Sequence, residues 1–421
     1  MKKTKWLAVC MAACALVMGC SSGDDGIKYD AAKWDIEGTT VVRYIGAEAD
    51  VRIPDGVTSI GALAFYECTS LESVEIPGSV TSIGNEAFRG CTSLASVTIP
   101  DGVTSIGSSA FYWCLSLASV EIPGSVESIG ADAFSWCTSL ASVTIGYGVE
   151  SIGYQAFYEC ESLASVEIPG SVTSIGWYAF EGCTSLAVTY GGTLAQWCQM
   201  DNDSYLLINA SSIKLSDGND LKSLKTLEIP SDVTKIGEYA FYNCTSLASV
   251  EIPGSVTSIG DSAFYGCTSL ESVEIPGSVT SIGDEAFRGC TSLESVEIPG
   301  SVESIGDWAF RGCTSLASVT IPDSVESIGD WAFYGCTSLE SVEIPASVTS
   351  IGEYAFSQCE SLESVTIPDS VESIGSFAFS SCYKLTEVKY GGTAEQWKKI
   401  DIGSFAFLYS VKITDKDGKE I

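Results

Sequence analysis

The stretch from Leu270 to Ser292 reads LESVEIPGSVTSIGDEAFRGCTS, and it decides the fold because most of the chain repeats it. Its phenylalanine recurs every 23 residues, six times before a break and seven times after it. The series is Phe65, Phe88, Phe111, Phe134, Phe157 and Phe180, then Phe241, Phe264, Phe287, Phe310, Phe333, Phe356 and Phe379. A fixed period of this length predicts a solenoid, in which each unit buries its apolar face only against its neighbours.

Each unit opens with a short strand that has one buried face. Val273 and Ile275 alternate with Ser272 and Glu274, the period-two pattern of such a strand. Pro276 ends it, because proline lacks an N–H and restricts the residue before it. Strands stacked about 4.8 Å apart would form a continuous parallel sheet roughly 60 Å long.

A second extended piece follows, and Val279 and Ile282 are expected to point inward from it. The glycine after it, Gly283 in this unit, recurs in all thirteen units. Such a glycine marks either a turn with positive φ or a tight approach of two backbones.

The unit ends with apolar residues at helical spacing. Ala286, Phe287 and Cys290 predict one helical turn with its apolar face inward. Aspartates directly after the glycine, such as Asp284 and Asp307, are suited to cap that turn.

The motif Cys-Thr-Ser-Leu-x-Ser-Val-x-Ile-Pro, followed by Ser-Ile-Gly-x-x-Ala-Phe, resembles the BspA-like, Treponema-type leucine-rich repeat of bacterial surface proteins. The resemblance covers roughly residues 50–390. It implies an α/β-type solenoid with a parallel inter-repeat sheet and short helical turns on the other side. It also implies adhesion to host matrix proteins or to other cells. The segment Thr40–Pro54 resembles the N-terminal cap of this family, and solenoids need such caps.

The first twenty residues have the pattern of a processing signal. Lys2, Lys3 and Lys5 precede an apolar stretch, residues 6–18, that is too short to span a bilayer. The sequence LVMGC that ends at Cys20 resembles the bacterial lipobox, which implies a lipid-modified cysteine at the mature N-terminus. An ordinary secretory signal with a chance cysteine is the alternative. We therefore expect an exported protein, lipid-anchored to the outer membrane or the cell surface.

The break between the repeats and the C-terminus are copies of each other. YGGTLAQW at Tyr190–Trp197 reappears as YGGTAEQW at Tyr390–Trp397, and in both a threonine followed by glutamine three residues later predicts a helix with a capping box. A strand-like piece follows each copy, from Ile213 and from Val411. Whether the sheet runs through the break is left open.

The chain thus divides into seven segments. They are a signal peptide (1–19), a tether (20–35), an N-terminal cap (36–54), a first block of six repeats (55–189), a cap-like insertion or bend (190–225), a second block of seven repeats (226–389) and a C-terminal cap (390–421).

Composition excludes several classes of function. The chain has no histidine, so Ser–His–Asp, Cys–His and HExxH chemistry are absent. A net charge of -33 repels phosphate backbones and anionic lipid heads, so we expect no nucleic-acid ligand and no membrane contact besides the anchor. We expect no enzyme, no cofactor and a monomer.

A column of thirteen repeat cysteines is expected to form buried free thiols, because stacked side chains point parallel and neither form disulfides nor converge on a metal. Cys198 stands outside this column and is expected to be the most exposed thiol after Cys20. Representative structural residues are Phe65, Phe88, Phe264, Phe287, Cys68, Cys91, Cys267 and Cys290.

Two sets of exposed positions are candidate binding sites. The first is an acidic column on the outer face of the strands, Glu75, Glu121, Glu167, Glu228, Glu251, Glu274, Glu297 and Glu343. Like charges opposed across strands destabilise a sheet, and a cationic partner would relieve this; simple solvation is the alternative. The second set is the variable aromatics Trp113, Trp136, Trp177, Trp308 and Trp331, with tyrosines such as Tyr158 and Tyr178. They either anchor an interface or stack on one another between coils.

These observations predict a surface binding protein that engages an extracellular protein, another cell or a cell-surface glycan through its repeats. Glycan or nutrient capture, with a sugar platform at Trp113 and Trp136, is one alternative, and a purely structural envelope protein is another. The sequence does not identify the ligand or the binding face.

Overall fold

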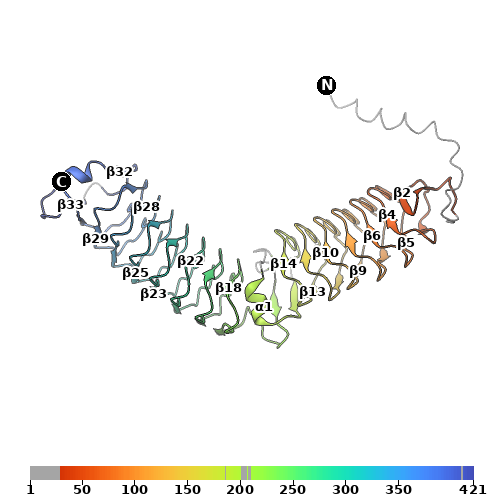
Figure 1. Ribbon diagram of the computed structural model, residues 1–421, viewed down its shortest axis with the longest axis horizontal. Coiled ribbons are helices and arrows are strands. Elements are labelled where there is room, and N and C mark those ends of the chain that lie inside the picture. Colours follow the sequence, from red (N-terminus) through yellow and green to blue (C-terminus); the bar gives the residue numbers. More distant parts are fainter. Residues whose placement is uncertain (1–28, 185, 201–205, 207–209, 409–410) are drawn as a thin grey trace, which may run out of the picture.

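In the computed structural model the chain forms a β-solenoid of about 16 turns. The structure describes residues 29–184, 186–200, 206, 210–408 and 411–421. The predicted signal peptide and Cys20 lie outside these residues. Within the described part, no helix is both long and apolar enough to cross a bilayer. Figure 1 shows two arms of stacked coils that meet at a bend in the middle of the chain.

Each coil contributes a strand to a long-strand sheet, in which strands have three or four residues. In the first block its members are β3 (Asp50–Arg52), β5 (Ser73–Glu75), β7 (Ser96–Thr98), β9 (Ser119–Ile122), β11 (Ser142–Ile145), β13 (Ser165–Ile168), β15 (Ala187–Tyr190) and β16 (Ser212–Lys214). In the second block they are β17 (Thr226–Glu228), β19 (Ser249–Glu251), β21 (Ser272–Glu274), β23 (Ser295–Glu297), β25 (Ser318–Thr320), β27 (Ser341–Glu343), β29 (Ser364–Ile367), β31 (Glu387–Tyr390) and β33 (Lys412–Thr414). All of these neighbours pair in parallel, as the sequence pattern predicted.

The second extended piece forms its own sheet, the short-strand sheet, whose repeat strands have two residues. The first block contributes β4 (Ser59–Ile60), β6 (Ser82–Ile83), β8 (Ser105–Ile106), β10 (Ser128–Ile129), β12 (Ser151–Ile152) and β14 (Ser174–Ile175). The second contributes β18 (Lys235–Ile236), β20 (Ser258–Ile259), β22 (Ser281–Ile282), β24 (Ser304–Ile305), β26 (Ser327–Ile328), β28 (Ser350–Ile351), β30 (Ser373–Ile374) and β32 (Asp401–Ile402).

The third side of each coil runs from the repeat glycine to the cysteine, and we call it the turn face. The prediction of a helical turn on this side was wrong. Glu285 and Gly289 both have positive φ, of 57° and 74°, which is incompatible with a right-handed helix. Their N–H groups instead bond to the carbonyl oxygens of Asp307 and Arg311 in the next coil, at 2.8 and 2.7 Å. Residues with left-handed φ therefore orient the backbone N–H groups along the solenoid axis, where they donate to carbonyl oxygens of the next coil.

The recurring glycine is required by close approach rather than by positive φ. A Cβ added to Gly283 would lie 2.7 Å from the backbone nitrogen of Asp261 in the preceding coil. We expected the aspartate after the glycine to cap its own turn, and this prediction was wrong. Asp284 Oδ1 accepts the N–H of Asp307 at 2.8 Å, and so ties one coil to the next.

The core is a set of continuous columns inside the coils. Phe264 and Phe287 are fully buried, and their rings stack with centroids 5.3 Å apart and an interplanar angle of 6°. The structural residues singled out in the sequence lie in these columns, with Cys68 at the edge and only partly buried. Each coil thus buries its apolar side chains mainly on its two neighbours, which is the reason that the repeat sequence specifies a stack.

The sheets of the two blocks do not pair with each other: β16 ends one and β17 begins the next. Helix α1 (Leu194–Gln199) lies at this junction, with the predicted capping box between Thr193 and Gln196. Trp197 is fully buried and its Nε1–H donates to the carbonyl oxygen of Ala240 at 2.8 Å. Cys198 is also buried, and the expectation that it is exposed was wrong, because its side of α1 packs on the second block.

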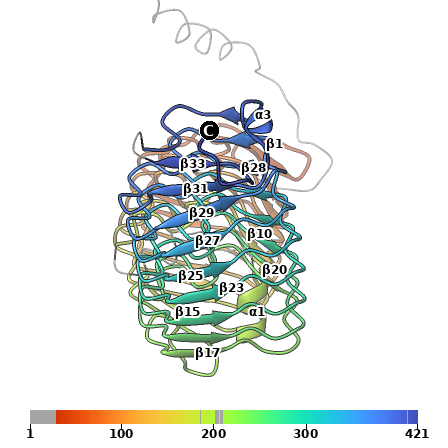
Figure 2. The ribbon, with the colours of Figure 1, turned by 90° about the vertical axis from the view of Figure 1, so that its left-hand side faces the viewer.

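Both ends of the solenoid are covered. The antiparallel hairpin of β1 (Trp34–Glu37) and β2 (Thr40–Tyr44) lies on the first coil, so the N-terminal cap begins two residues before the boundary expected at residue 36. Helix α3 (Ala394–Trp397), with the predicted capping box of Thr393 and Gln396, lies at the other end. Figure 2 shows α3 and β33 at the C-terminal end of the stack.

Candidate functional site

The cysteine column is buried structure. All fourteen described cysteines are free, and thirteen are buried. Cys290 Sγ, for example, donates to the carbonyl oxygen of Phe264 at 3.2 Å. Burial raises the pKa of the Cys290 thiol well above its usual value, so it is neither a nucleophile nor a thiolate ligand at neutral pH.

The predicted acidic column is exposed and continuous only in the second block. Glu228, Glu251, Glu274 and Glu297 stand directly opposite one another in register. In the first block and at Glu343 the column is interrupted: Glu121, Glu167 and Glu343 stand opposite threonines, and Glu75 stands between Thr98 and Arg52. A shallow depression of about 520 Å³ adjoins Glu228 and Glu251, with Asn219 and Leu224 in its lining. A binding role for the column stays a prediction.

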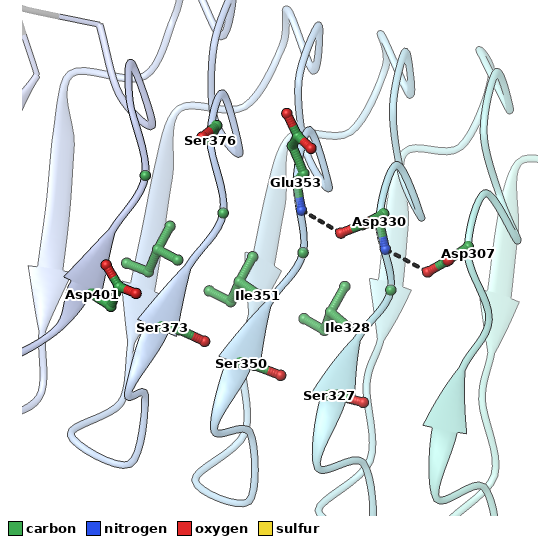
Figure 3. A pocket seen from close by; sticks show the side chains of 15 residues that line it. Asp307, Ser327, Ile328, Asp330, Ser350, Ile351, Glu353, Ser373, Ser376 and Asp401 are labelled. Atoms are coloured by element: carbon green, nitrogen blue, oxygen red, sulfur yellow. Dashed lines mark hydrogen bonds between the residues drawn. The ribbon is translucent and has the colours of Figure 1, made fainter.

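A shallow groove of about 610 Å³ runs along the short-strand sheet of the second block. Figure 3 shows Asp307, Asp330 and Glu353 along one side of it. The N–H of Asp330 donates to Asp307 Oδ1 at 2.7 Å, and the N–H of Glu353 donates to Asp330 Oδ1 at 2.6 Å. Glycines form its floor because the coils approach closely there: a Cβ on Gly352 would lie 2.6 Å from the backbone of Gly329. The groove is therefore a product of the coil-to-coil bonding.

The aromatic residues of the second block cover one another. Trp308 and Trp331 stack with centroids 5.3 Å apart, Trp331 and Tyr354 at 4.1 Å, and Tyr354 and Phe377 at 4.8 Å. Phe377 stacks in turn on Phe405. We call these five residues the second-block ring ladder. Trp308, Trp331, Tyr354 and Phe377 each stack on a neighbouring ring, and of the five only Phe405 at the end of the ladder is largely exposed. This stacking favours the structural interpretation of Trp308 and Trp331.

Arginines complete this ladder. The guanidinium carbon of Arg311 lies 4.3 Å from the ring centre of Trp308 and 5.0 Å from that of Trp331. Arg288 lies 4.7 Å from the ring centre of Trp308. Such contacts stabilise by about 0.5–2 kcal/mol each, depending on exposure.

The aromatic residues of the first block are arranged differently. Trp177 is 59% exposed, Trp113 51% and Tyr154 47%. Tyr178 meets Tyr154 and Trp177 edge-on, with interplanar angles of 87° and 72°. Within the described residues no ring stacks face to face on Trp177 or Tyr154, and both side chains are about half exposed; we call their ring faces open in this sense. We call the set Trp113, Trp136, Tyr154, Tyr158, Trp177 and Tyr178 the first-block aromatic surface.

Backbone hydrogen bonds between neighbouring coils on the turn face fix the positions of these side chains. Trp136 N–H bonds to the carbonyl oxygen of Tyr158 at 2.7 Å, and Gln155 N–H to that of Trp177 at 3.0 Å. Trp136 and Tyr158 also touch, with centroids 6.1 Å apart. Consecutive coils therefore present their rings as one patch on the turn face.

Two of these tryptophans occupy a strained backbone position. Trp113 and Trp136 have φ of 63° and 62° at the position before the repeat cysteine. Six sister coils place glycine there, namely Gly90, Gly182, Gly266, Gly289, Gly312 and Gly335. A side chain in this left-handed region costs roughly 1–2 kcal/mol, so stability alone would not select tryptophan.

Carboxylates lie among the exposed rings. Burial raises the pKa of Glu181, and the charge of Glu159 raises it further. Burial also raises the pKa of Tyr158, followed by the charges of the same two glutamates, which places this tyrosine near both. The sequence has no lysine or arginine between Arg89 and Lys214. The patch therefore combines open ring faces with carboxylates that no cation of these coils neutralises.

The 23-residue coil with its Phe, Cys and Ile–Pro columns matches the family model described as BspA type leucine-rich repeat region, over residues 50–187, 218–339 and 281–414. The chain belongs to this family. BspA-type coils thus account for most of the chain, and the first-block aromatic surface is a local variation on them. None of the curated proteins matches the chain.

The chain is similar to several solved structures. A leucine-rich repeat protein from Bacteroides ovatus is 27% identical, with a TM-score of 0.55, over 94% of this chain and 100% of that one. A leucine rich cell surface protein from Faecalibacterium prausnitzii is 28% identical, with a TM-score of 0.40, over 92% of this chain and 98% of that one. The first of these supports the BspA-type solenoid fold assigned above.

Of the residues on this surface, Trp113, Trp136 and Trp177 were predicted from the sequence, and Tyr154, Glu159 and Glu181 were not. A signal for Tyr154 was present: in the second block the position after the repeat glycine is acidic from Glu238 to Glu353, whereas Tyr154 and Trp177 occupy it in the first block. The glutamates gave no such signal, because glutamate is common throughout these BspA-type coils.

Proposed function

We propose that the protein is a lipid-anchored recognition protein of the cell surface, which binds a host matrix protein or another cell through the first-block aromatic surface. The observation that carries this proposal is the pair of open ring faces at Tyr154 and Trp177. Exposed aromatic side chains are the usual anchors of protein interfaces, because they bury a large area with little loss of conformational entropy.

Three further observations support it. The lipobox-like sequence ending at Cys20 supports export and anchoring. Membership of the BspA-type repeat family supports a surface role. The histidine-free composition and the buried, high-pKa thiols argue against catalysis as the function of the coils.

The test is binding of the chain from Ser21 to Ile421 to immobilised matrix proteins, whole bacterial cells and polysaccharides, at low and high salt. We expect a matrix protein or a cell to bind, and the double variant Tyr154→Ala/Trp177→Ala to weaken that binding about tenfold or more. The matched control is Tyr147→Ala, because Tyr147 is 73% exposed but lies between β11 and β12, away from the patch.

Equal binding by the double variant and the control would contradict the assignment of the site. Binding to polysaccharide alone, insensitive to salt, would replace the proposal by glycan capture. Failure of every ligand class to bind would favour a structural envelope protein.

A further inference from the structure

The repeat allows the two blocks to be compared position by position on the turn face. Arg288 and Arg311 occupy the position directly after the core phenylalanine, and both lie over ring faces. Arg89 holds the same position near the N-terminus and lies 5.0 Å from the ring centre of Tyr112. Where the chain has exposed rings beside this position, it therefore tends to cover them with its own guanidinium group.

The coils of the first-block aromatic surface lack that group. The position of Arg288 and Arg311 is taken there by Ser135, Tyr158 and Glu181. The rings of Tyr154 and Trp177 are exposed, and Glu181 stands where Arg288 and Arg311 stand in the second block.

The carboxylates of this surface favour a positively charged ligand. Glu159 and Glu181 belong to adjacent coils, which are joined by the bond from Glu159 N–H to the carbonyl oxygen of Glu181 at 2.7 Å. Their mutual repulsion is not relieved by any lysine or arginine between Arg89 and Lys214. An incoming cation would gain both from the ring faces and from this pair.

Building on the proposed function, we propose that the first-block aromatic surface binds an arginine-rich segment of a partner protein. The incoming guanidinium groups stack on the rings of Tyr154 and Trp177, as Arg288 and Arg311 stack on rings of the second block, while Glu159 and Glu181 accept their N–H groups. Arginine fits better than lysine, because its planar group stacks on a ring and still presents its edge N–H donors to a carboxylate.

The test uses the chain from Ser21 to Ile421 and three short peptides that differ only in alternate residues: arginine, lysine and glutamine. Titration followed by tryptophan fluorescence and by calorimetry should show binding in the order arginine, lysine, glutamine, weakening as salt rises. The variants Trp177→Ala and Glu159→Gln/Glu181→Gln should each bind the arginine peptide about tenfold more weakly.

The matched control is Glu251→Gln/Glu274→Gln, which removes the same charge from the long-strand sheet of the other block. It should leave the affinity unchanged. An equal loss in this control would mean non-specific attraction to an acidic protein and would overturn the inference, as would equal binding of the glutamine peptide.

Different results would contradict the arginine-rich partner and the binding surface itself. If a matrix protein or cell binds through Tyr154 and Trp177 while the arginine peptide does not bind, the surface stands and the arginine partner is wrong. If a neutral oligosaccharide binds there in place of the peptide, the partner class is wrong as well.

Discussion

At the scale of single residues, tryptophan has two uses in this chain. Trp331 lies between Trp308 and Tyr354, with a guanidinium group beside it, so its faces are part of the structure. Trp177 meets its neighbour edge-on and is mostly exposed. The two occupy different positions in the repeat: Trp331 is the second residue after the repeat glycine, where neighbouring coils also carry aromatic rings, and Trp177 is the first.

The strained tryptophans give a prediction about stability. At Trp113 the substitution to glycine removes both the ring and the left-handed strain, whereas alanine removes only the ring. We expect Trp113→Gly to have a free energy of unfolding about 1 kcal/mol higher than Trp113→Ala, measured by urea denaturation. Alanine as stable as glycine would mean that the position carries no strain.

The buried thiols give a prediction about reactivity. Burial raises the pKa of the column cysteines, to about 12 for Cys313. Because only the thiolate reacts, the folded chain from Ser21 to Ile421, which has fourteen cysteines, should label with a disulfide reagent at pH 8 only at Cys68, which is partly exposed.

The matched variant is Cys68→Ser, which should remove labelling of the folded chain and leave thirteen thiols that react after unfolding in urea. Rapid labelling of several thiols in the folded state would show that the column is open.

At the scale of elements, the two copies of the module ending differ where they meet their surroundings. In the internal copy Trp197, Cys198 and Met200 are buried against the second block. In the terminal copy Lys398 takes the place of Cys198, and Trp397 is only partly covered. A lysine at this position keeps the end of the solenoid solvated and so discourages further stacking.

This comparison predicts unequal effects of one substitution. Trp197→Ala removes a fully buried side chain and its hydrogen bond to Ala240, and should lower the free energy of unfolding by about 3–5 kcal/mol. It should also split denaturation into two transitions, because α1 joins the blocks. Trp397→Ala is the internal control and should have a clearly smaller effect with a single transition; equal effects would contradict the role of α1.

The elements also show what the sequence determines locally. The strands around Val273 follow from alternation and from the Ile–Pro step, and the capping boxes at Thr193 and Thr393 from a short motif, so all were predictable. The turn face was not, because Ala286, Phe287 and Cys290 point inward equally well from a helix or from alternating left-handed turns. Bonds to the next coil decide between these, and no single-coil pattern contains them.

At the scale of the whole molecule, the two blocks have the same repeat scaffold but different side chains on the turn face. The second block fills its turn face with stacked rings, two arginines and a ladder of aspartates that ties coils together. The first block leaves rings open on the same face, in a stretch without any cation between Arg89 and Lys214. The sequence predicted that exposed aromatics were candidates in both blocks, and the contacts between coils show which of them stack on one another.

The central claim is that open rings in the first block recognise a partner while stacked rings in the second block hold the fold. The most direct measurement compares Trp177→Ala with Trp331→Ala for both partner binding and urea denaturation. The account predicts that Trp177→Ala weakens binding about tenfold with little change in stability, and that Trp331→Ala lowers stability by about 1–3 kcal/mol while binding is kept. The reverse pattern, or loss of both properties in both variants, would contradict it.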